Sequence, residues 1–364
     1  MKIGILGTRG IPNRYGGFEQ FAEIASQHWV SQGHEVLVYC GHNHEYRQAE
    51  FKGVKRISIF DPEFVIGTAG QFFYDLGCIL DARTRGFDVL LQLGYTSSSV
   101  WSFLLPSKPL IVTNMDGLEW KRAKFSPMVQ QFLRWAESRA VSSSDILVAD
   151  SLGIQSYLKT RYNKESEYIA YGADVPEVTE SHEVLQKYQV EYLGYNLVIA
   201  RMEPENNIEM ILEGMKISGF KRPTLVVGNT GNGFGTMMKA KYENENVRFL
   251  GGIYNIDHLN VLRKCCYLYY HGHSVGGTNP SLLEAMALGI VLSVHQNEFN
   301  SSVLESDGLY FTNAQEIAVQ QTQPLDLDRQ QVANNLISKI QQKFSWDFIS
   351  SEYLRVFHNG QKKI

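Results

Sequence analysis

Short apolar runs alternate with amphipathic helical stretches along the whole chain. Uninterrupted apolar strands separated by helices are typical of parallel sheets that helices cover on both faces. We expect strands over residues 2–6, 35–40, 54–60, 88–93, 110–114, 145–150, 167–171, 196–201, 223–228, 247–251, 267–271 and 290–294. The sequence therefore predicts an α/β fold made of doubly wound parallel sheets.

The length of the chain predicts two domains, because 364 residues exceed the size at which a single hydrophobic core stops growing. The stretch 172–195 is polar and charged, and it is the one break in composition between two alternating halves. We place an N-terminal domain at 1–172, a C-terminal domain at 173–345 and a closing helix at 346–364. Ligands of such sheets bind at the carboxyl ends of the strands.

Composition excludes several classes of protein. The chain is 44% hydrophobic and 20% charged, as expected of a folded globular protein, and its formal charge of −4 gives no electrostatic reason to bind nucleic acid. No stretch reaches the roughly 20 apolar residues of a spanning helix, and the first apolar run is too short for a signal peptide. The four cysteines show no metal-binding spacing, so we expect a cytoplasmic chain.

Three segments read as a strand, a glycine-rich or polar loop and then a helix: 7–19, 200–215 and 272–289. The N-terminus of a helix carries unpaired backbone N–H groups and the positive end of the helix dipole, so it can hold a phosphate. Together with the cation of Arg201 and the carboxylate of Glu284, such helix ends suit a nucleoside diphosphate.

Individual residues of the second and third segments have two interpretations each. Arg201 ends a strand and could neutralise a diphosphate with paired hydrogen bonds, whereas most surface arginines are only solvated. Gly277 and Thr278 precede a helix that Asn279 or Thr278 caps, which leaves their amides free to face a ligand. Glu284 could accept the hydroxyls of a ribose, or it could be an ordinary carboxylate on a helix surface.

The N-terminal half offers weaker signals. The first loop could begin a dinucleotide fingerprint at Gly7, but the glycine spacing is wrong and the second strand lacks a terminal acidic residue. In the segment 114–122, Asp116 is either half of a turn pair or a contact for substrate hydroxyls, with Lys121 or Arg122 near a charged acceptor. The lone Asp-x-Asp at 326–328 is interpreted as a helix start, so we expect no metal ion.

The chain resembles glycosyltransferase family 4, whose retaining enzymes have the GT-B fold, in YGGFE, ARMEPENN, PSLLEAMALG and the Ser-Trp pair that begins the last helix. The segments 7–19 and 114–122 are more narrowly similar to a bacterial branch that includes rhamnosyltransferases of capsule and cell-wall polysaccharide assembly. The resemblance implies two Rossmann-like domains facing a central cleft, the first binding the acceptor and the second the donor. It also allows the C-terminal helix to cross back to the first domain.

The resemblance implies that Gly16 and Gly17 line the donor phosphates, that Arg201 holds the diphosphate, and that Glu284 binds the ribose. Gly276 stands where the family's first paired glutamate is expected, and Asn206 replaces the usual lysine. The residues that we assign to catalysis are Asp116 and Arg201; those for donor binding are Gly16, Gly17, Arg201, Asn206, Gly277, Thr278, Asn279 and Glu284; and those for acceptor binding are Glu19, Lys121 and Arg122.

The function implied by the resemblance is a metal-independent, retaining transfer of a sugar from a nucleotide-diphosphate donor to a saccharide acceptor in surface polysaccharide synthesis. The bacterial branch suggests L-rhamnose from dTDP-rhamnose and an acceptor linked to polyprenyl diphosphate. Three alternatives are a nucleotide-sugar epimerase of the same architecture, an NAD-dependent oxidoreductase and an inactive scaffold.

The segment 120–140 combines basic residues with large apolar ones, which predicts that the N-terminal domain docks on the inner face of the membrane. The basic residues are Lys121, Arg122, Lys124, Arg134 and Arg139. Met128, Phe132 and Trp135 share one face of a helix that begins near Pro127. The alternative is that this apolar stripe packs on the sheet, with Glu137 opposing the basic charge.

Overall fold

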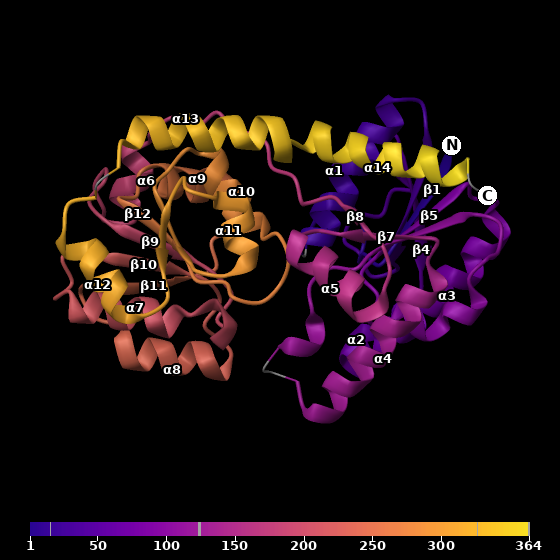
Figure 1. Ribbon diagram of the computed structural model, residues 1–364, viewed down its shortest axis with the longest axis horizontal. Coiled ribbons are helices and arrows are strands. Elements are labelled where there is room, and N and C mark those ends of the chain that lie inside the picture. The colour runs from indigo at the N-terminus through magenta and orange to yellow at the C-terminus, as the bar shows by residue number, and fades with distance from the viewer. Residues whose placement is uncertain (15, 123–124, 326, 363–364) are drawn as a thin grey trace. The chain divides into compact units, whose positions relative to one another are not determined.

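The computed structural model describes residues 1–14, 16–122, 125–325 and 327–362 (Figure 1). Its internal contacts divide the chain into two compact units. Unit 1 comprises Met1–Gly172 and Trp346–Ile364, and unit 2 comprises Ala173–Ser345. Among the described residues no helix has both the length and the apolar character needed to cross a membrane.

Unit 1 is built on an eight-stranded sheet with the strand order β3-β4-β2-β1-β5-β6-β7-β8. All neighbouring strands are parallel except β3 and β4. The strands are β1 (Lys2–Leu6), β2 (Glu35–Gly41), β3 (Glu50–Phe51), β4 (Val54–Ile59), β5 (Val89–Leu93), β6 (Leu110–Asn114), β7 (Ile146–Ala149) and β8 (Glu167–Tyr168). The strand order reverses between β1 and β5, and the carboxyl ends of strands at such a point are where ligands bind in α/β sheets.

Helices of unit 1 connect these strands and cover the sheet (Figure 1). They are α1 (Gly17–Ser31), α2 (Glu63–Ile66), η1 (Gly67–Ala69), α3 (Gly70–Arg85), η2 (Ser98–Leu104), η3 (Glu119–Lys121), α4 (Pro127–Ser143), α5 (Leu152–Tyr162) and α14 (Trp346–Gln361). Helix α1 ends at Ser31, two residues before the predicted stop at Gly33, which has a φ of 83° and donates its N–H to the carbonyl of Val30 at 2.9 Å.

Helix α4 buries a different face from the one that its apolar stripe suggests. Its buried residues are Leu133, Ala136, Glu137, Ala140 and Val141. Met128 is 82% exposed and Trp135 is 46% exposed, so the alternative in which this stripe packs on the sheet is wrong. The helix packs mainly against η2 and η3. Lys124 lies outside the described residues.

The C-terminal helix α14 packs on α1 within unit 1, as the fold prediction allows (Figure 1). Trp29 of α1 is fully buried, and its indole N–H donates to the carbonyl of Ser350 at 2.9 Å. The ring of Tyr353 lies 4.8 Å from that of Phe21, and its hydroxyl accepts a hydrogen bond from the side-chain amide of Asn114 at 2.9 Å. The last helix is therefore part of the core of the first unit.

Unit 2 has a six-stranded parallel sheet with the strand order β11-β10-β9-β12-β13-β14. Its strands are β9 (Asn196–Ile199), β10 (Thr224–Val227), β11 (Val247–Gly251), β12 (Leu268–His271), β13 (Leu292–His295) and β14 (Leu309–Phe311). Its helices are α6 (His182–Lys187), η4 (Pro204–Asn206), α7 (Ile208–Ile217), α8 (Gly233–Tyr242), α9 (Ile256–Lys264), α10 (Pro280–Ala287), α11 (Glu298–Leu304), α12 (Ala314–Thr322), α13 (Arg329–Lys339) and the π-helical η5 (Ile340–Phe344). The order reverses between β9 and β12, which is the ligand-binding position of this second sheet.

The prediction of an α/β fold with two doubly wound sheets is confirmed. Two strands were not predicted: β3 has two residues in a hairpin around Gly53, and β14 has three. Such short edge strands leave almost no periodic signal in a sequence. Asp328 caps α13 by accepting hydrogen bonds from two backbone amides, which confirms the helix start; its companion at position 326 lies outside the described residues.

We expect Tyr353→Phe to destabilise unit 1, because the buried amide of Asn114 loses its hydrogen-bond acceptor. A buried donor left without a partner costs about 1–3 kcal/mol in the free energy of unfolding. Chemical denaturation measures this loss. Arg355→Gln is the matched control on the same helix, since that side chain is 44% exposed and its replacement should cost under about 0.5 kcal/mol. Equal stability of wild type and Tyr353→Phe would contradict the structural role of α14.

Candidate functional site

Arg201 lies just beyond the carboxyl end of β9 and is exposed, on a turn that Asn206 closes. The side-chain amide of Asn206 donates to the carbonyl oxygen of Arg201 at 2.7 Å, and the amide of Glu203 donates to the same oxygen at 2.8 Å. Asn206 is only 6% exposed. The structure therefore gives Asn206 a part in shaping the turn that presents Arg201, a contact that the sequence did not indicate.

Hydrogen bonds join the loop after β9 to the loop after β12. Asn207 donates to the carbonyl of Gly272 at 2.7 Å. Ser274 donates through its backbone amide and its hydroxyl to the carbonyl of Glu205, at 3.0 and 2.8 Å. A side chain at Gly272 would place its Cβ only 2.1 Å from the backbone oxygen of Asn206, so this approach requires glycine. The second and third sequence segments thus form one rigid edge of unit 2.

The loop after β12 leads into α10, whose first residue is Pro280. Asn279 caps the helix, because its side-chain oxygen accepts the amide of Ser281 at 2.9 Å; this decides between the two caps that the sequence allowed. Thr278 is buried and Gly277 is half-buried immediately before the cap. Gly276 has a φ of 126°, and nothing lies within 4 Å of a Cβ built on it, so open space surrounds the position where the sequence resemblance led us to expect a glutamate.

Glu284 lies one turn into α10 and forms an ion pair with Arg263 of α9. The distance between Arg263 Nη2 and Glu284 Oε2 is 2.6 Å. The arginine side chain is 3% exposed and the glutamate side chain 31%, so a buried cation fixes a carboxylate that still reaches solvent. Sequence reasoning missed Arg263, because it lies on an amphipathic helix with no local sign of a partner on α10.

Two histidines stack at the carboxyl end of β12. The rings of His271 and His273 lie 4.2 Å apart with an angle of 16° between their planes. His271 is 1% exposed, and neither of its ring nitrogens has a hydrogen-bond partner among the described residues. Burial lowers the pKa of His271 well below its ordinary value, with a further contribution from His273, so the ring is neutral. Nothing in the amino-acid sequence singles out this pair of histidines.

In unit 1 the first glycine-rich loop follows β1 and is fixed by Glu19 of α1. Glu19 is 5% exposed, and its carboxylate accepts the backbone amide of Arg9 at 2.8 Å. Gly16 is the N-cap of α1, and a Cβ there would contact Glu19 at 3.4 Å. Gly17 is the first residue of the helix. Glu19 was predicted to contact the acceptor; in the structure its Oε1 orders the loop.

A pocket of about 330 Å³ opens beside this loop, at the carboxyl ends of β1, β2 and β4. It is lined by Arg9, Gly10, Arg14, Glu19, Asn43, His44, Glu45, Asp61, Glu63 and Phe64. The Arg9 guanidinium makes two hydrogen bonds to Glu63 of α2, at 3.0 and 2.8 Å, and holds the pKa of that carboxyl below its usual value. Sequence reasoning missed Glu63 and Asp61, because they are remote in sequence from the loop that they meet; Arg9 and Glu63 are 54 residues apart.

Asp75 of α3 is a buried carboxyl close to this pocket. Burial raises its pKa from 3.8 to about 6; the nearby charge of Asp61 acts in the same direction, and a hydrogen bond from Ser97 at 2.5 Å opposes it. The folded protein therefore retains a proton on Asp75 at pH values where the unfolded chain has lost it.

This shift predicts that the free energy of unfolding falls by up to about 3 kcal/mol as the pH rises from about 4 to about 6. Stability falls with rising pH because an acid whose pKa is raised in the folded state contributes to the stability of the fold only while it is protonated. Asp75→Asn should remove that part of the pH dependence, measured by denaturation across this range. Asp347→Asn, at a side chain that is 91% exposed, should keep it. A pH dependence unchanged in Asp75→Asn would contradict the assignment.

The loop after β6 holds Asp116 in a left-handed conformation with φ of 51°. Its backbone amide donates to the side-chain oxygen of Asn114 at 2.9 Å, and Asn114 in turn donates to Tyr353 of α14. Lys121 is exposed, whereas Arg122 forms an ion pair with Glu119 at 2.5 Å. Asp116, Lys121 and Arg122 thus share one loop, but none of them lines the pocket beside the first loop.

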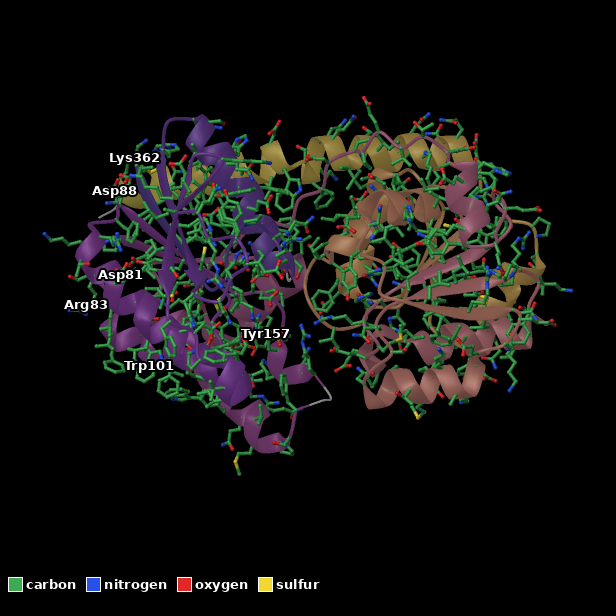
Figure 2. All side chains as sticks on the ribbon, turned by 180° about the vertical axis from the view of Figure 1, so that it is seen from behind. Asp81, Arg83, Asp88, Trp101, Tyr157 and Lys362 are labelled. Atoms are coloured by element: carbon green, nitrogen blue, oxygen red, sulfur yellow. The ribbon has the colours of Figure 1, made fainter. Side chains whose placement is uncertain are left out.

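The side chain of Glu137, on α4, binds this loop through Trp120. It is 1% exposed and accepts hydrogen bonds from the indole of Trp120 at 3.1 Å and from the hydroxyls of three tyrosines. These are Tyr95, Tyr157 (labelled in Figure 2) and Tyr162, at 3.3, 2.7 and 2.6 Å. Burial, followed by the hydrogen bond to Glu137, raises the pKa of Tyr162 to about 12. The prediction that Glu137 opposes the basic surface charge is therefore wrong, because its charge is buried.

The described residues contain no group of three or more His, Cys, Asp and Glu side chains that could hold a metal ion.

Comparisons with solved structures match almost the entire chain. Sucrose-phosphate synthase from Thermosynechococcus elongatus is 14% identical over 98% of each chain, with a TM-score of 0.80. HepE of Anabaena in complex with UDP-glucose is 16% identical over 98% of this chain and 99% of its own, with a TM-score of 0.76. A glycosyltransferase from Rickettsia africae is 13% identical over 100% and 99%, with a TM-score of 0.73. The chain has the GT-B fold.

Comparison of the amino-acid sequence with known families gives one partial match. A family profile described as a domain of unknown function, DUF1972, matches residues 1–85 and 107–174. No curated protein sequence matches the chain. The GT-B fold accounts for the two doubly wound units. The function must be inferred from the residues at the carboxyl ends of the two sheets.

Proposed function

We propose that the protein is a retaining glycosyltransferase that uses a nucleotide-diphosphate sugar. The observation that carries the proposal is the edge of unit 2, where Arg201, the start of α10 and Glu284 follow strands whose exit loops are hydrogen-bonded together. A cation and the positive end of a helix dipole suit a diphosphate, and a carboxylate fixed by Arg263 suits the hydroxyls of a ribose. HepE, which shares the fold, has been crystallised with UDP and UDP-glucose.

The chemistry that we propose needs no protein nucleophile. As the bond from sugar to diphosphate breaks, the sugar gains the character of an oxocarbenium ion and negative charge grows on the diphosphate. Arg201 and the amides of Gly277 and Thr278 stabilise that charge. The acceptor hydroxyl attacks from the face that the diphosphate leaves and passes its proton to a phosphate oxygen of the donor. Asn206 acts through the turn that presents Arg201.

The acceptor in this proposal is a saccharide that binds unit 1. The pocket beside the first loop offers side-chain oxygens of Asn43 and Asp61 for sugar hydroxyls, next to the ring of Phe64. The loop that holds Asp116 adds a carboxylate, and Lys121 adds a cation for a charged acceptor. Gly16 and Gly17 are proposed to face the donor phosphates at the start of α1. L-rhamnose as the sugar and a polyprenyl-diphosphate-linked acceptor are proposals that rest on the family resemblance.

Incubating the pure protein with a panel of nucleotide sugars tests this function. Each donor is supplied first alone and then with lipid-linked and free oligosaccharides, and products are identified by mass and by the anomeric configuration of the new bond. We expect transfer with retention only when an acceptor is present. A changed nucleotide sugar released without acceptor would instead identify an epimerase.

Arg201→Ala should lower kcat far more than it raises KM, because the charge that it meets develops in the transition state. Loss of one such electrostatic contact typically costs roughly 3–4 kcal/mol in kcat, or several hundredfold. Steady-state kinetics with varied donor measure both constants. Lys216→Ala, on an exposed face of α7, is the control and should leave both unchanged. Normal turnover in Arg201→Ala would remove this residue from the mechanism.

Activity should survive dialysis against EDTA, because we propose that Arg201 and helix amides provide the charge stabilisation that a metal ion gives in other transferases. The measurement is the rate of sugar transfer before and after dialysis, with and without added Mg²⁺ or Mn²⁺. A rate that collapses on dialysis and returns with either ion would show that this stabilisation scheme is wrong.

A further inference from the structure

One surface of unit 1 exposes large aromatic and aliphatic side chains from three helical elements, α3, η2 and α4. We call it the aromatic face and define it by Phe73, Trp101, Phe103, Met128, Phe132 and Trp135. Phe73 is 56% exposed, Phe103 68%, Met128 82% and Trp135 46%. Single exposed apolar side chains are common on protein surfaces, but a cluster of them marks an interaction site.

Contacts through Phe72 join four side chains of the aromatic face, namely Trp101, Phe103, Phe132 and Trp135. The ring of Phe132 lies 5.8 Å from that of Phe72 and 5.7 Å from that of Trp135. The ring of Trp101 lies 6.4 Å from that of Phe103, and its indole N–H donates to the carbonyl of Phe72 at 2.7 Å. The three elements thus present one surface, with Phe72 at the junction.

Basic side chains border this face. The guanidinium of Arg83 donates to the carbonyl of Leu104 at the end of η2, and Figure 2 shows Arg83 and Trp101 near each other. Arg139 donates to Ser102 at 3.1 Å. Arg134 lies 4.2 Å from the ring of Trp120, and Lys121 lies 5.6 Å from the same ring.

Negative charge on the same elements is buried or paired. Asp75 is 5% exposed and Glu137 is 1% exposed with four hydrogen-bond donors around it. Asp81 forms an ion pair with Arg85 at 2.8 Å, and η2 contains no acidic residue. Glu119, close to Lys121, is paired with Arg122. The aromatic face is therefore positively charged although the whole chain carries a formal charge of −4.

We propose that the aromatic face docks on a bilayer of anionic phospholipid. Aromatic side chains favour the boundary between headgroups and acyl chains, and lysine and arginine beside them attract anionic headgroups. A second copy of the chain is the competing occupant, but a symmetric dimer would bring two positively charged faces together. Lipid docking goes beyond the proposed sugar transfer, and it is measurable with neither donor nor acceptor present.

Flotation with vesicles tests this docking. The full-length protein is mixed at low salt with vesicles of phosphatidylcholine alone or of phosphatidylcholine and phosphatidylglycerol. Each basic residue near an anionic surface contributes about fivefold to binding, so we expect binding to the anionic vesicles at least about 20-fold stronger than to the neutral ones. Raising the salt concentration should weaken it, because ions screen the attraction.

Substitutions on the aromatic face test whether this surface contacts the bilayer. Met128→Ser with Trp135→Ser should weaken binding at least about tenfold, and Arg134→Gln about fivefold. Tyr254→Ser is the control, because this side chain of unit 2 is 91% exposed and lies outside the aromatic face. All these side chains are exposed, so thermal unfolding should be unchanged in every variant.

Three outcomes would overturn the proposal. The first is equal, negligible flotation with both kinds of vesicle. The second is binding to anionic vesicles that the aromatic-face variants leave unchanged. The third is a wild-type protein that self-associates in size-exclusion chromatography without binding lipid, and that becomes monomeric in the Met128 and Trp135 variant; the face would then belong to a second copy. Because no substrate is present, none of these results bears on whether the protein transfers sugar.

Discussion

The hydrogen bonds between the exit loops of β9 and β12 are the interaction on which the proposed donor site depends. Asn207, Ser274 and the side chain of Asn206 satisfy backbone carbonyls that the sheet leaves unpaired where the strands end. Without them the turn that carries Arg201 and the loop that leads into α10 would be two independent flexible segments. With them, a cation and a helix N-terminus are held at one edge before any ligand arrives, which is the preorganisation that charge stabilisation requires.

A second constraint is how the chain places its carboxylates. Glu284 is fixed by a buried arginine, Glu19 by a backbone amide and Glu137 by four neutral donors. Each glutamate was assigned from the sequence to a ligand or to the surface, and each has a structural partner. Burial of Glu137 organises the loop that holds Asp116 and at the same time removes the one acidic charge of α4 from a basic, aromatic surface.

The fold was predictable because apolar strands, a glycine stop at Gly33 and a proline at the start of α10 are local signals, and each carries a direct physical meaning. The caps were predictable to within one residue for the same reason, as Asn279 shows. What the sequence could not supply are partners that meet only in three dimensions, such as Arg263 with Glu284, Arg9 with Glu63, and His271 with His273. Helix periodicity left open whether the apolar stripe of α4 is packed or exposed, because an apolar stripe has the same spacing in both cases; the structure exposes Met128 and Trp135.

Calorimetric titration with UDP, dTDP and the corresponding nucleosides tests the central claim, that the edge of unit 2 binds a nucleoside diphosphate. We expect a diphosphate to bind to the wild-type protein far more tightly than its nucleoside, since Arg201 and α10 recognise the phosphates. We also expect Glu284→Gln to weaken binding of the diphosphate while the fold, followed by circular dichroism, stays intact. Failure of every nucleoside diphosphate to bind, or equal affinity for nucleoside and diphosphate, would contradict it.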